Sequence, residues 1–235
     1  MIEELLPAEV SSAEAFTDPP DVILFPEEEA LIAHARDKRR REFTTGRWCA
    51  HQALSRLGVP PAPLLRGERG APKWPARIIG SITHCAAYRA AVVARAEQVR
   101  TLGIDAEPHA PLPAGVLNVV SLAAERTHLA ELSTVHPDTH WDRILFSCKE
   151  TVYKAWYPIT RQWLGFEDAR LELGTGTFTA HLRKEGAELA GRPLTAFTGR
   201  WLVRKGLVVS AIAVPNRSWG DRPTHEGHPQ TNLLG

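Results

Sequence analysis

The segment 138-DTHWDRILFSCKETVYKAWY-157 carries the strongest local pattern in the sequence. Its apolar side chains recur at steps of three and four, a spacing that places them along one face of an α-helix. They are Trp141, Ile144, Leu145, Cys148, Val152, Ala155 and Trp156. We therefore predict a helix from about Asp138 to Tyr157 with one buried stripe, ended by Pro158 because proline interrupts helical hydrogen bonding.

The chain before this helix predicts helices followed by strands. Residues 26–57 are rich in helix formers and predict two helices. Three short apolar segments follow at 78–83, 88–94 and 101–105, separated by turn-sized gaps. Such spacing is typical of an antiparallel strand meander.

The chain around and after the helix repeats that order. Residues 108–113 contain three prolines and make the best candidate linker. A helix is expected at 121–132, and the glycine-containing turns at 174–176 and 205–206 predict two hairpins, 171–182 and 197–214.

These elements predict an α/β (α+β) protein of two lobes, each with helices and a small, mainly antiparallel sheet. We expect an N-terminal lobe at 1–108 and a C-terminal lobe at 109–215. Residues 216–235 are polar and rich in Gly, Pro, Asn and His, so we expect a disordered tail.

Composition narrows the function. Lys and Arg total 28 against 27 for Asp and Glu, so the chain has no general affinity for nucleic acid, and any anion site must be local. No apolar run approaches bilayer length, and the first residues lack a basic region followed by an apolar core. We expect a cytoplasmic protein that does not bind membranes. Three widely spaced cysteines fit neither a disulfide framework nor a zinc pattern.

Two acidic positions end the strand predicted at 101–105. Asp105 and Glu107 are two residues apart, so a strand places them on one face, where paired carboxylates suit a divalent cation. The alternative is a solvated strand end. On the long helix, Glu150 and Lys154 are four residues apart. They form either an ordinary exposed ion pair or, together with Lys149 at the flank of this helix face, a third carboxylate and two lysines for a metal-bound pyrophosphate.

A second group of residues suits a phosphate. Thr83 ends the strand predicted at 78–83 and His84 follows it directly, and Arg39 and Arg47 lie two helical turns apart. Imidazole and guanidinium groups donate hydrogen bonds to phosphate oxygens. The alternatives are a turn histidine with local partners and a solvated basic helix face.

Four blocks of sequence, taken together, resemble the surfactin- and enterobactin-type phosphopantetheinyl transferases, most closely the enterobactin-synthetase component D branch. The resemblance runs from about Arg36 to Pro158. The blocks are Phe43-Thr44-Thr45-Gly46-Arg47; Gly70-Ala71-Pro72-Lys73-Trp74-Pro75 leading to Gly80-Ser81-Ile82-Thr83-His84-Cys85; Gly103-Ile104-Asp105-Ala106-Glu107; and Phe146-Ser147-Cys148-Lys149-Glu150-Thr151-Val152-Tyr153-Lys154-Ala155.

The resemblance implies a pseudo-twofold fold in a monomer, with coenzyme A in the cleft between the lobes. It implies that Mg²⁺, or Mn²⁺, is held by Asp105, Glu107 and Glu150. It implies that coenzyme A is bound by Arg39, Arg47, Arg66, Lys73, Trp74, Pro75, Thr83, His84, Lys149 and Lys154. Lys149 and Lys154 would neutralise the pyrophosphate, and the loop with Lys73, Trp74 and Pro75 would border the nucleotide.

The implied reaction is that of a holo-[acyl-carrier-protein] synthase type enzyme. It moves phosphopantetheine from coenzyme A to a serine of an acyl or peptidyl carrier protein and releases 3′,5′-ADP. The implied catalytic residues are Glu150, Lys154 and Asp105, with Glu150 deprotonating the serine directly or through a water. Carriers of fatty-acid, polyketide, nonribosomal-peptide and siderophore synthesis all qualify. The alternatives are a Mg²⁺-dependent nucleotide phosphohydrolase and a binding module with a vestigial site, although the complete acidic and basic set argues against the module.

Overall fold

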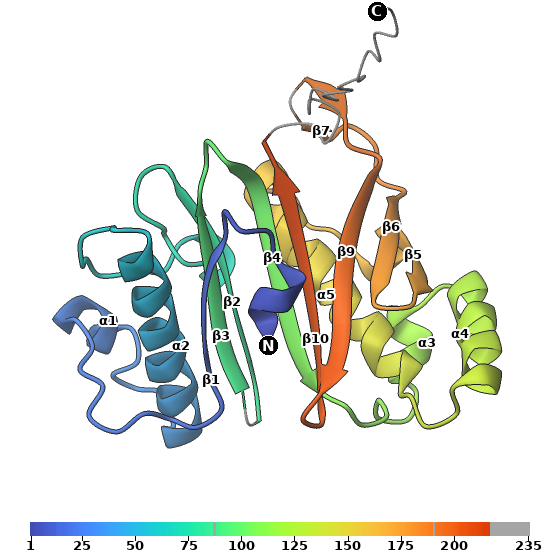
Figure 1. The fold of residues 1–235 in the computed structure, drawn as a ribbon, viewed down its shortest axis with the longest axis horizontal. Coiled ribbons are helices and arrows are strands. Elements are labelled where there is room, and N and C mark those ends of the chain that lie inside the picture. Colours follow the sequence, from blue (N-terminus) through green and yellow to red (C-terminus); the bar gives the residue numbers. More distant parts are fainter. Residues whose placement is uncertain (87, 190, 217–235) are drawn as a thin grey trace, which may run out of the picture.

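The first half of the molecule is a small sheet with a long helix beside it. The computed structural model describes residues 1–86, 88–189 and 191–216 (Figure 1). The three-stranded antiparallel sheet has the order β1-β3-β2. Its elements and neighbours are η1 (Ile2–Leu5), β1 (Ser11–Ala15), α1 (Pro26–Ala30), α2 (Asp37–Arg56), η2 (Glu68–Gly70), β2 (Ile78–Cys85) and β3 (Tyr88–Arg95).

The second half repeats this arrangement on a larger scale. Its five-stranded antiparallel sheet has the order β4-β10-β9-β6-β5, and β7 pairs with β8 separately. The strands are β4 (Val99–Pro108), β5 (Ala169–Gly174), β6 (Thr177–Leu182), β7 (Glu188–Leu189), β8 (Arg192–Pro193), β9 (Ala196–Arg204) and β10 (Leu207–Pro215). The helices are α3 (Val116–Val120), α4 (Ala123–Val135), α5 (Trp141–Thr160) and η3 (Phe166–Asp168).

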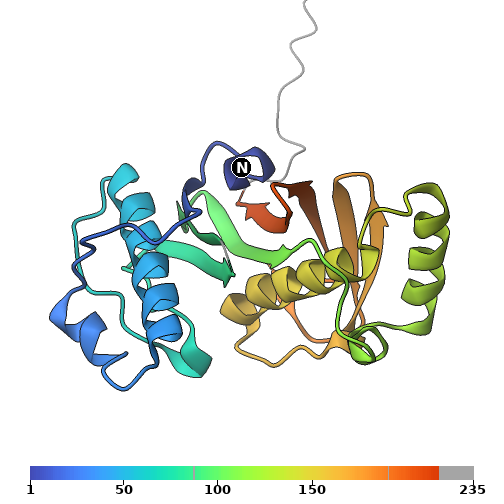
Figure 2. The same cartoon turned by 90° about the horizontal axis from the view of Figure 1, so that it is seen from below.

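Each sheet buries one face against its long helix, and the opposite faces share a third core. In Figures 1 and 2, α2 lies beside the three-stranded sheet and α5 lies along β4 and the larger sheet. The shared core joins β3, β4, β10 and η1, with Val92, Ile104 and Val209 among its fully buried side chains. The expected α/β architecture of two helix-and-sheet halves is therefore confirmed.

The strand β4 is where the halves meet. We expected a meander through 101–105, but β4 pairs with β10 and is absent from the sheet of β2 and β3. The edge of β4 toward the first half is bound by side chains instead. Ser81 Oγ accepts a hydrogen bond from the Ile104 N–H, and Thr83 Oγ1 accepts one from the Ala106 N–H, both at 3.1 Å. The lobe boundary at 108/109 stays a proposal, with β4 belonging to the sheet of the second half.

Most local predictions are confirmed, with the following further differences. The long helix begins at Trp141 and continues past Pro158 to Thr160. Pro158 is tolerated because it lies in the last turn, where its missing N–H removes a single helical hydrogen bond. The elements β1, α3, β7 and β8 were not predicted. The predicted tail at 216–235 lies outside the described residues, apart from Asn216.

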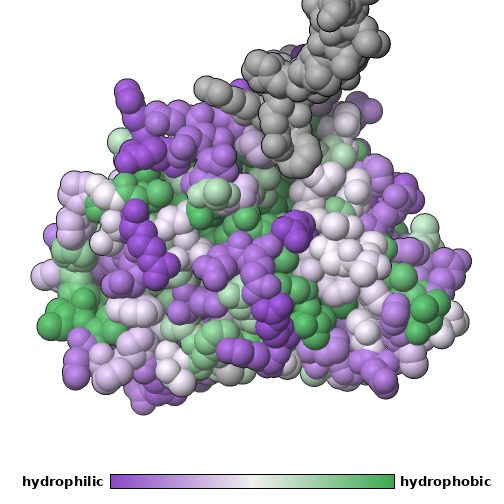
Figure 3. Space-filling model, in the orientation of Figure 1, coloured by the Kyte–Doolittle hydropathy of each residue, from purple (hydrophilic) through white to green (hydrophobic). Residues whose placement is uncertain are grey.

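The described part of the chain contains no helix that combines the length and the apolar composition needed to cross a lipid bilayer. On the face drawn in Figure 3, hydrophilic residues lie between smaller groups of hydrophobic ones.

Candidate functional site

A glycine brings the long helix against the strand that carries the two predicted carboxylates. Gly103 lies two residues before Asp105, so both face the same side of β4. A Cβ atom at Gly103 would come within 2.8 Å of the Ala155 backbone nitrogen and closer still to the Thr151 carbonyl oxygen. The backbones of β4 and α5 therefore touch here, and this contact places Glu150 and Lys154 beside the end of β4.

Asp105 is the centre of the site. It is 5% exposed, and its Oδ1 accepts hydrogen bonds from Lys154 Nζ at 2.8 Å and from Thr83 Oγ1 at 3.3 Å. Its other oxygen, Oδ2, is buried and makes no hydrogen bond with any residue that the structure describes. A buried carboxylate oxygen without a partner is unfavourable, so this atom is prepared for a further ligand.

The other two carboxylates are crowded by Asp105. Burial raises the pKa of Glu150, the charge of Asp105 raises it further, and Lys154 opposes the shift. The pKa of Glu107 is raised in the same way, and Arg143 opposes that shift by donating to Glu107 Oε2 at 2.9 Å. The site therefore holds more negative charge than its lysine and arginine fully stabilise.

The donor set fits a divalent cation, although the described residues contain no compact group of three His, Cys, Asp or Glu side chains arranged around one point. One oxygen of Asp105 is bonded to Lys154, and one oxygen of Glu107 is bonded to Arg143. The unpartnered Asp105 Oδ2 and the all-oxygen donors Asp105, Glu107 and Glu150 are what a hard cation such as Mg²⁺ or Mn²⁺ binds.

The predicted phosphate ligands of the first half adjoin this carboxylate group. His84 Nε2 lies 3.0 Å from Arg39 Nη1 and 3.3 Å from Glu42 Oε2. Burial lowers the pKa of His84, and the nearby charges of Arg39 and Lys154 lower it too, against Glu42. His84 of the first half and Lys154 of the second half are therefore close enough for their charges to interact.

Arg47 belongs to a region of concentrated positive charge. The residue is 6% exposed, and its guanidinium lies over the Phe43 ring at 4.5 Å. Its buried Nε has no hydrogen-bond partner among the described residues, although Glu28 Oε1 lies 3.8 Å away. Burial lowers the pKa of Arg47 to about 10, and the positive charges of Arg39 and Arg66 contribute in the same direction while Glu28 opposes them. An anion bound near these three arginines would relieve their mutual repulsion.

The remaining predicted nucleotide contacts lie on one loop beside β2. The Lys73 N–H donates to the Leu65 carbonyl at 2.8 Å, and the Pro75 carbonyl accepts from Ile78 at 3.0 Å. The Trp74 ring lies so close to Gly80 that a Cβ atom there would be 2.7 Å from it. The loop is thus fixed to β2 with Trp74 against the strand.

The structure does not bring Lys149 to this site, which corrects the expectation for that residue. Its side chain is buried, and Nζ lies 2.7 Å from the Phe166 carbonyl, 2.9 Å from the Ala169 carbonyl and 2.9 Å from Glu125 Oε2. An ammonium group has three N–H donors, so these acceptors saturate it. Lys149 is a structural contact of the second half.

Two residues of the site were missed from the sequence, Glu42 and Arg143. Glu42 contacts Arg39 at 3.8 Å and His84 at 3.3 Å. Arg143 contacts Glu107. Both had a signal in helical spacing, because Glu42 follows Arg39 by three residues and Arg143 precedes Glu150 by seven, which is two turns on one face.

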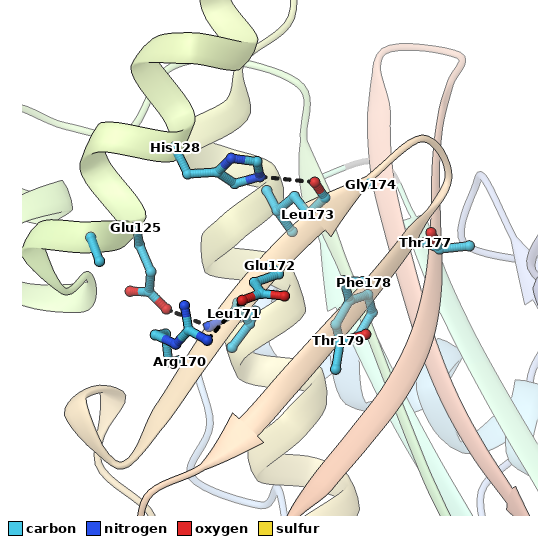
Figure 4. A pocket seen from close by; sticks show the side chains of 11 residues that line it. Glu125, His128, Arg170, Leu171, Glu172, Leu173, Gly174, Thr177, Phe178 and Thr179 are labelled. Atoms are coloured by element: carbon cyan, nitrogen blue, oxygen red, sulfur yellow. Dashed lines mark hydrogen bonds and ion pairs between the residues drawn. The ribbon is translucent and has the colours of Figure 1, made fainter.

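A separate cavity of about 500 Å³ lies between α4 and the β5–β6 hairpin (Figure 4). Glu125 and His128 reach from α4 to the edge of β5, where Glu125 Oε1 accepts from the Leu171 N–H at 2.7 Å and His128 Nε2 lies 2.9 Å from the Leu173 carbonyl. These polar groups already cover the strand edge. None of the predicted site residues lines this cavity.

Comparison with known families gives two matches that together span most of the chain. Residues 27–94 match the model of the 4′-phosphopantetheinyl transferase N-terminal domain, and residues 101–201 match that of the 4′-phosphopantetheinyl transferase superfamily.

Individual relatives agree with the family models. The chain is 55% identical to 4′-phosphopantetheinyl transferase Svp of Streptomyces mobaraensis over 91% of this chain and 89% of the relative. It is 50% identical to 4′-phosphopantetheinyl transferase PptT of Mycobacterium tuberculosis over 91% of this chain and 98% of the relative. A more distant relative is enterobactin synthase component D of Escherichia coli, 34% identical over 54% of this chain and 59% of the relative.

Proposed function

The chain belongs to the 4′-phosphopantetheinyl transferase superfamily, and on this premise we propose the reaction, the ligands and the residues that carry them out. The enzyme transfers 4′-phosphopantetheine from coenzyme A to a serine of an acyl or peptidyl carrier protein, as a holo-[acyl-carrier-protein] synthase does. The relatives do not favour the nucleotide phosphohydrolase alternative, since Svp and PptT are both named as transferases.

One observation supports the site assignment above the others: the buried Asp105 carboxylate is bonded by Lys154 from one half and Thr83 from the other, and still has a free oxygen. We propose that Asp105, Glu107 and Glu150 bind Mg²⁺, with Mn²⁺ as an alternative. When bound, the cation supplies positive charge to the pyrophosphate oxygens of coenzyme A.

The arginine region is proposed to bind the 3′-phosphate end of the same substrate. The charges of Arg39 and Arg66 both act on Arg47. The charges of Arg39 and Lys154 both act on His84, which therefore lies between the arginines and the carboxylate site. The loop with Lys73, Trp74 and Pro75 would then border the nucleotide. Coenzyme A would thus extend from the arginines to the carboxylates, a path within a single chain that supports a monomeric enzyme.

Glu150 is proposed as the general base. Burial and the charge of Asp105 raise the pKa of Glu150, which makes it a better proton acceptor than an ordinary glutamate, and the ammonium of Lys154 favours its ionised form. The carrier serine loses its proton to Glu150, directly or through a water. The serine oxygen bonds to the β-phosphorus, and the bond from this phosphorus to the oxygen of 3′,5′-ADP breaks.

Lys154 is proposed to stabilise the charge that develops on the pyrophosphate. Its ammonium has three donors, and the described residues offer two acceptors, Asp105 Oδ1 at 2.8 Å and Thr83 Oγ1 at 3.4 Å. The third N–H is available to a phosphate oxygen. Because Asp105 and Thr83 hold the ammonium in place beforehand, little reorganisation is needed during the reaction.

The test is intact mass spectrometry of purified apo carrier proteins after incubation with the enzyme, coenzyme A and Mg²⁺. The assay compares carriers of fatty-acid, polyketide and nonribosomal-peptide synthesis. We also propose that the reaction takes place in the cytoplasm, because coenzyme A is a cytoplasmic metabolite. We expect a gain of one phosphopantetheine that is lost in Glu150→Gln. Consumption of coenzyme A with no gain on any carrier would refute the proposal.

A further inference from the structure

Arg143 lies in the first turn of α5, at the junction of the two halves, and each of its three guanidinium nitrogens donates a hydrogen bond. Nη1 donates to Glu107 Oε2, Nε donates to the Ala110 carbonyl, and Nη2 donates to the Pro111 carbonyl, each at 2.9 Å. The side chain is 14% exposed. Three bonds in different directions fix a planar guanidinium, so Arg143 has one defined position.

This position also fixes the carboxylate at the end of β4. Glu107 is the second-last residue of the strand, followed directly by the proline-containing linker that Arg143 binds through two carbonyls. One oxygen of Glu107 is held by Arg143, while Oε1 makes no hydrogen bond or ion pair with any described residue. Without Arg143, the Glu107 side chain would be free to rotate at a strand end, where such rotation costs little.

The same pattern holds at Asp105. There Lys154 and Thr83 hold Oδ1 and leave Oδ2 without a partner. Each carboxylate of β4 thus has one oxygen bound by a residue of the chain and one left over. A metal ligand in a protein is commonly oriented in this way by a hydrogen bond to its other atom.

We propose that Arg143 is a positioning residue for the cation site: it holds Glu107 by one oxygen so that the other faces the cation. The proposal rests on the metal assignment made above for Asp105, Glu107 and Glu150. Arg143 has no contact with the substrate in this account and acts through Glu107 alone.

The competing explanation is purely structural, because two of the three bonds of Arg143 go to linker carbonyls. The two explanations differ in what happens when Glu107 is already removed. If Arg143 works through Glu107, replacing it matters only while Glu107 is present. If Arg143 only secures the linker, its replacement has the same effect on either background.

The experiment measures Mn²⁺ binding by electron paramagnetic resonance, with coenzyme A present and no carrier protein, corrected for Mn²⁺ bound by coenzyme A alone. The variants are Arg143→Met, Arg143→Lys, Glu107→Gln and the double variant Arg143→Met with Glu107→Gln. Arg126→Met is the matched control, since Arg126 donates from a helix to the Ser121 carbonyl at 2.9 Å and forms no ion pair with a carboxylate in the described part of the chain. Thermal melts of each variant measure folding independently.

We expect Arg143→Met to weaken Mn²⁺ binding by about 10- to 100-fold, the usual effect of removing a residue that orients a metal ligand. Arg143→Lys should recover part of the loss, and Arg126→Met should bind normally. In the Glu107→Gln background, Arg143→Met should change the affinity less than about twofold.

Two results would overturn the proposal: unchanged Mn²⁺ affinity in a folded Arg143→Met, or an equal loss from Arg143→Met in both Glu107 backgrounds. If Glu107→Gln itself leaves Mn²⁺ binding unchanged, the metal assignment fails with it. That failure is distinguishable from failure of the transferase function, which the carrier mass assay tests separately.

Discussion

Gly103→Ala should move α5 away from β4 and so separate Glu150 and Lys154 on the helix from Asp105 and Glu107 on the strand. The added methyl would lie 2.8 Å from the Ala155 backbone nitrogen and 3.1 Å from its Cβ, and would overlap the Thr151 carbonyl oxygen. Real Cβ atoms rarely approach within about 3.4 Å of such atoms, so α5 must shift by roughly 0.5–1 Å. Backbone atoms cannot rotate away as a side chain can.

The shift has two measurable results. Overpacking of this kind costs about 1–3 kcal/mol of folding stability, and each kcal/mol lowers the Tm of a chain of this length by about 2–4 °C. Since Glu150 and Lys154 are carried on α5, a displacement of about 1 Å should lower kcat by about 100-fold. Differential scanning calorimetry and a carrier-loading assay at saturating coenzyme A measure the two quantities.

The control is Gly46→Ala in α2, where the added methyl meets only Ile82 Cγ2 at 3.4 Å, an ordinary contact. Alanine favours a helix over glycine by about 0.5–1 kcal/mol, so this variant should be as stable as the parent or more so. Full activity and an unchanged Tm in Gly103→Ala would show that α5 does not depend on this contact, and the reasoning about the site would be wrong.

Three further variants test single residues. Burial and the charge of Asp105 raise the pKa of Glu150, so its ionisation destabilises the fold as the pH rises through that pKa. Glu150→Gln should therefore raise the Tm measured in thermal melts at about pH 8, and should hardly change it at about pH 4. Lys149→Met should lower the free energy of unfolding, measured in urea titrations, by about 3–5 kcal/mol, because Glu125 is left buried without its cation. The KM for coenzyme A should stay unchanged, and a raised KM with normal stability would contradict this prediction. Arg39→Gln should raise the KM for coenzyme A about tenfold or more but not that for 3′-dephospho-coenzyme A, and equal effects on both substrates would exclude a phosphate contact.

The parts of the fold that the sequence predicted correctly are those set by neighbours along the chain. The stripe of α5 and the hairpin β9–β10 depend on spacing and turn residues, which are local. The pairing of β4 is not local, since Asp105 lies opposite Ser210 in the sheet. The sequence of an apolar strand does not indicate which distant strand it pairs with. The strand β1 was missed because its sequence, SSAEA, lacks the β-branched and aromatic residues typical of strands.

The long helix shows why the resemblance over 146–155 could not by itself distinguish the residues of the site from those of the core. An α-helix turns about 100° per residue, so Lys149 and Lys154 lie roughly 140° apart and cannot both face β4. Glu150 and Lys154 differ by only about 40°, and Arg143, which precedes Glu150 by seven residues, lies between them, so these three share an arc of about 40°. Two of the three contact the carboxylates of β4, Arg143 at Glu107 and Lys154 at Asp105, and Glu150 interacts with the charge of Asp105. Any change that rotates or lifts α5 must therefore alter base, lysine and carboxylate orientation together, whereas a change at Lys149 reaches only the core on the other side.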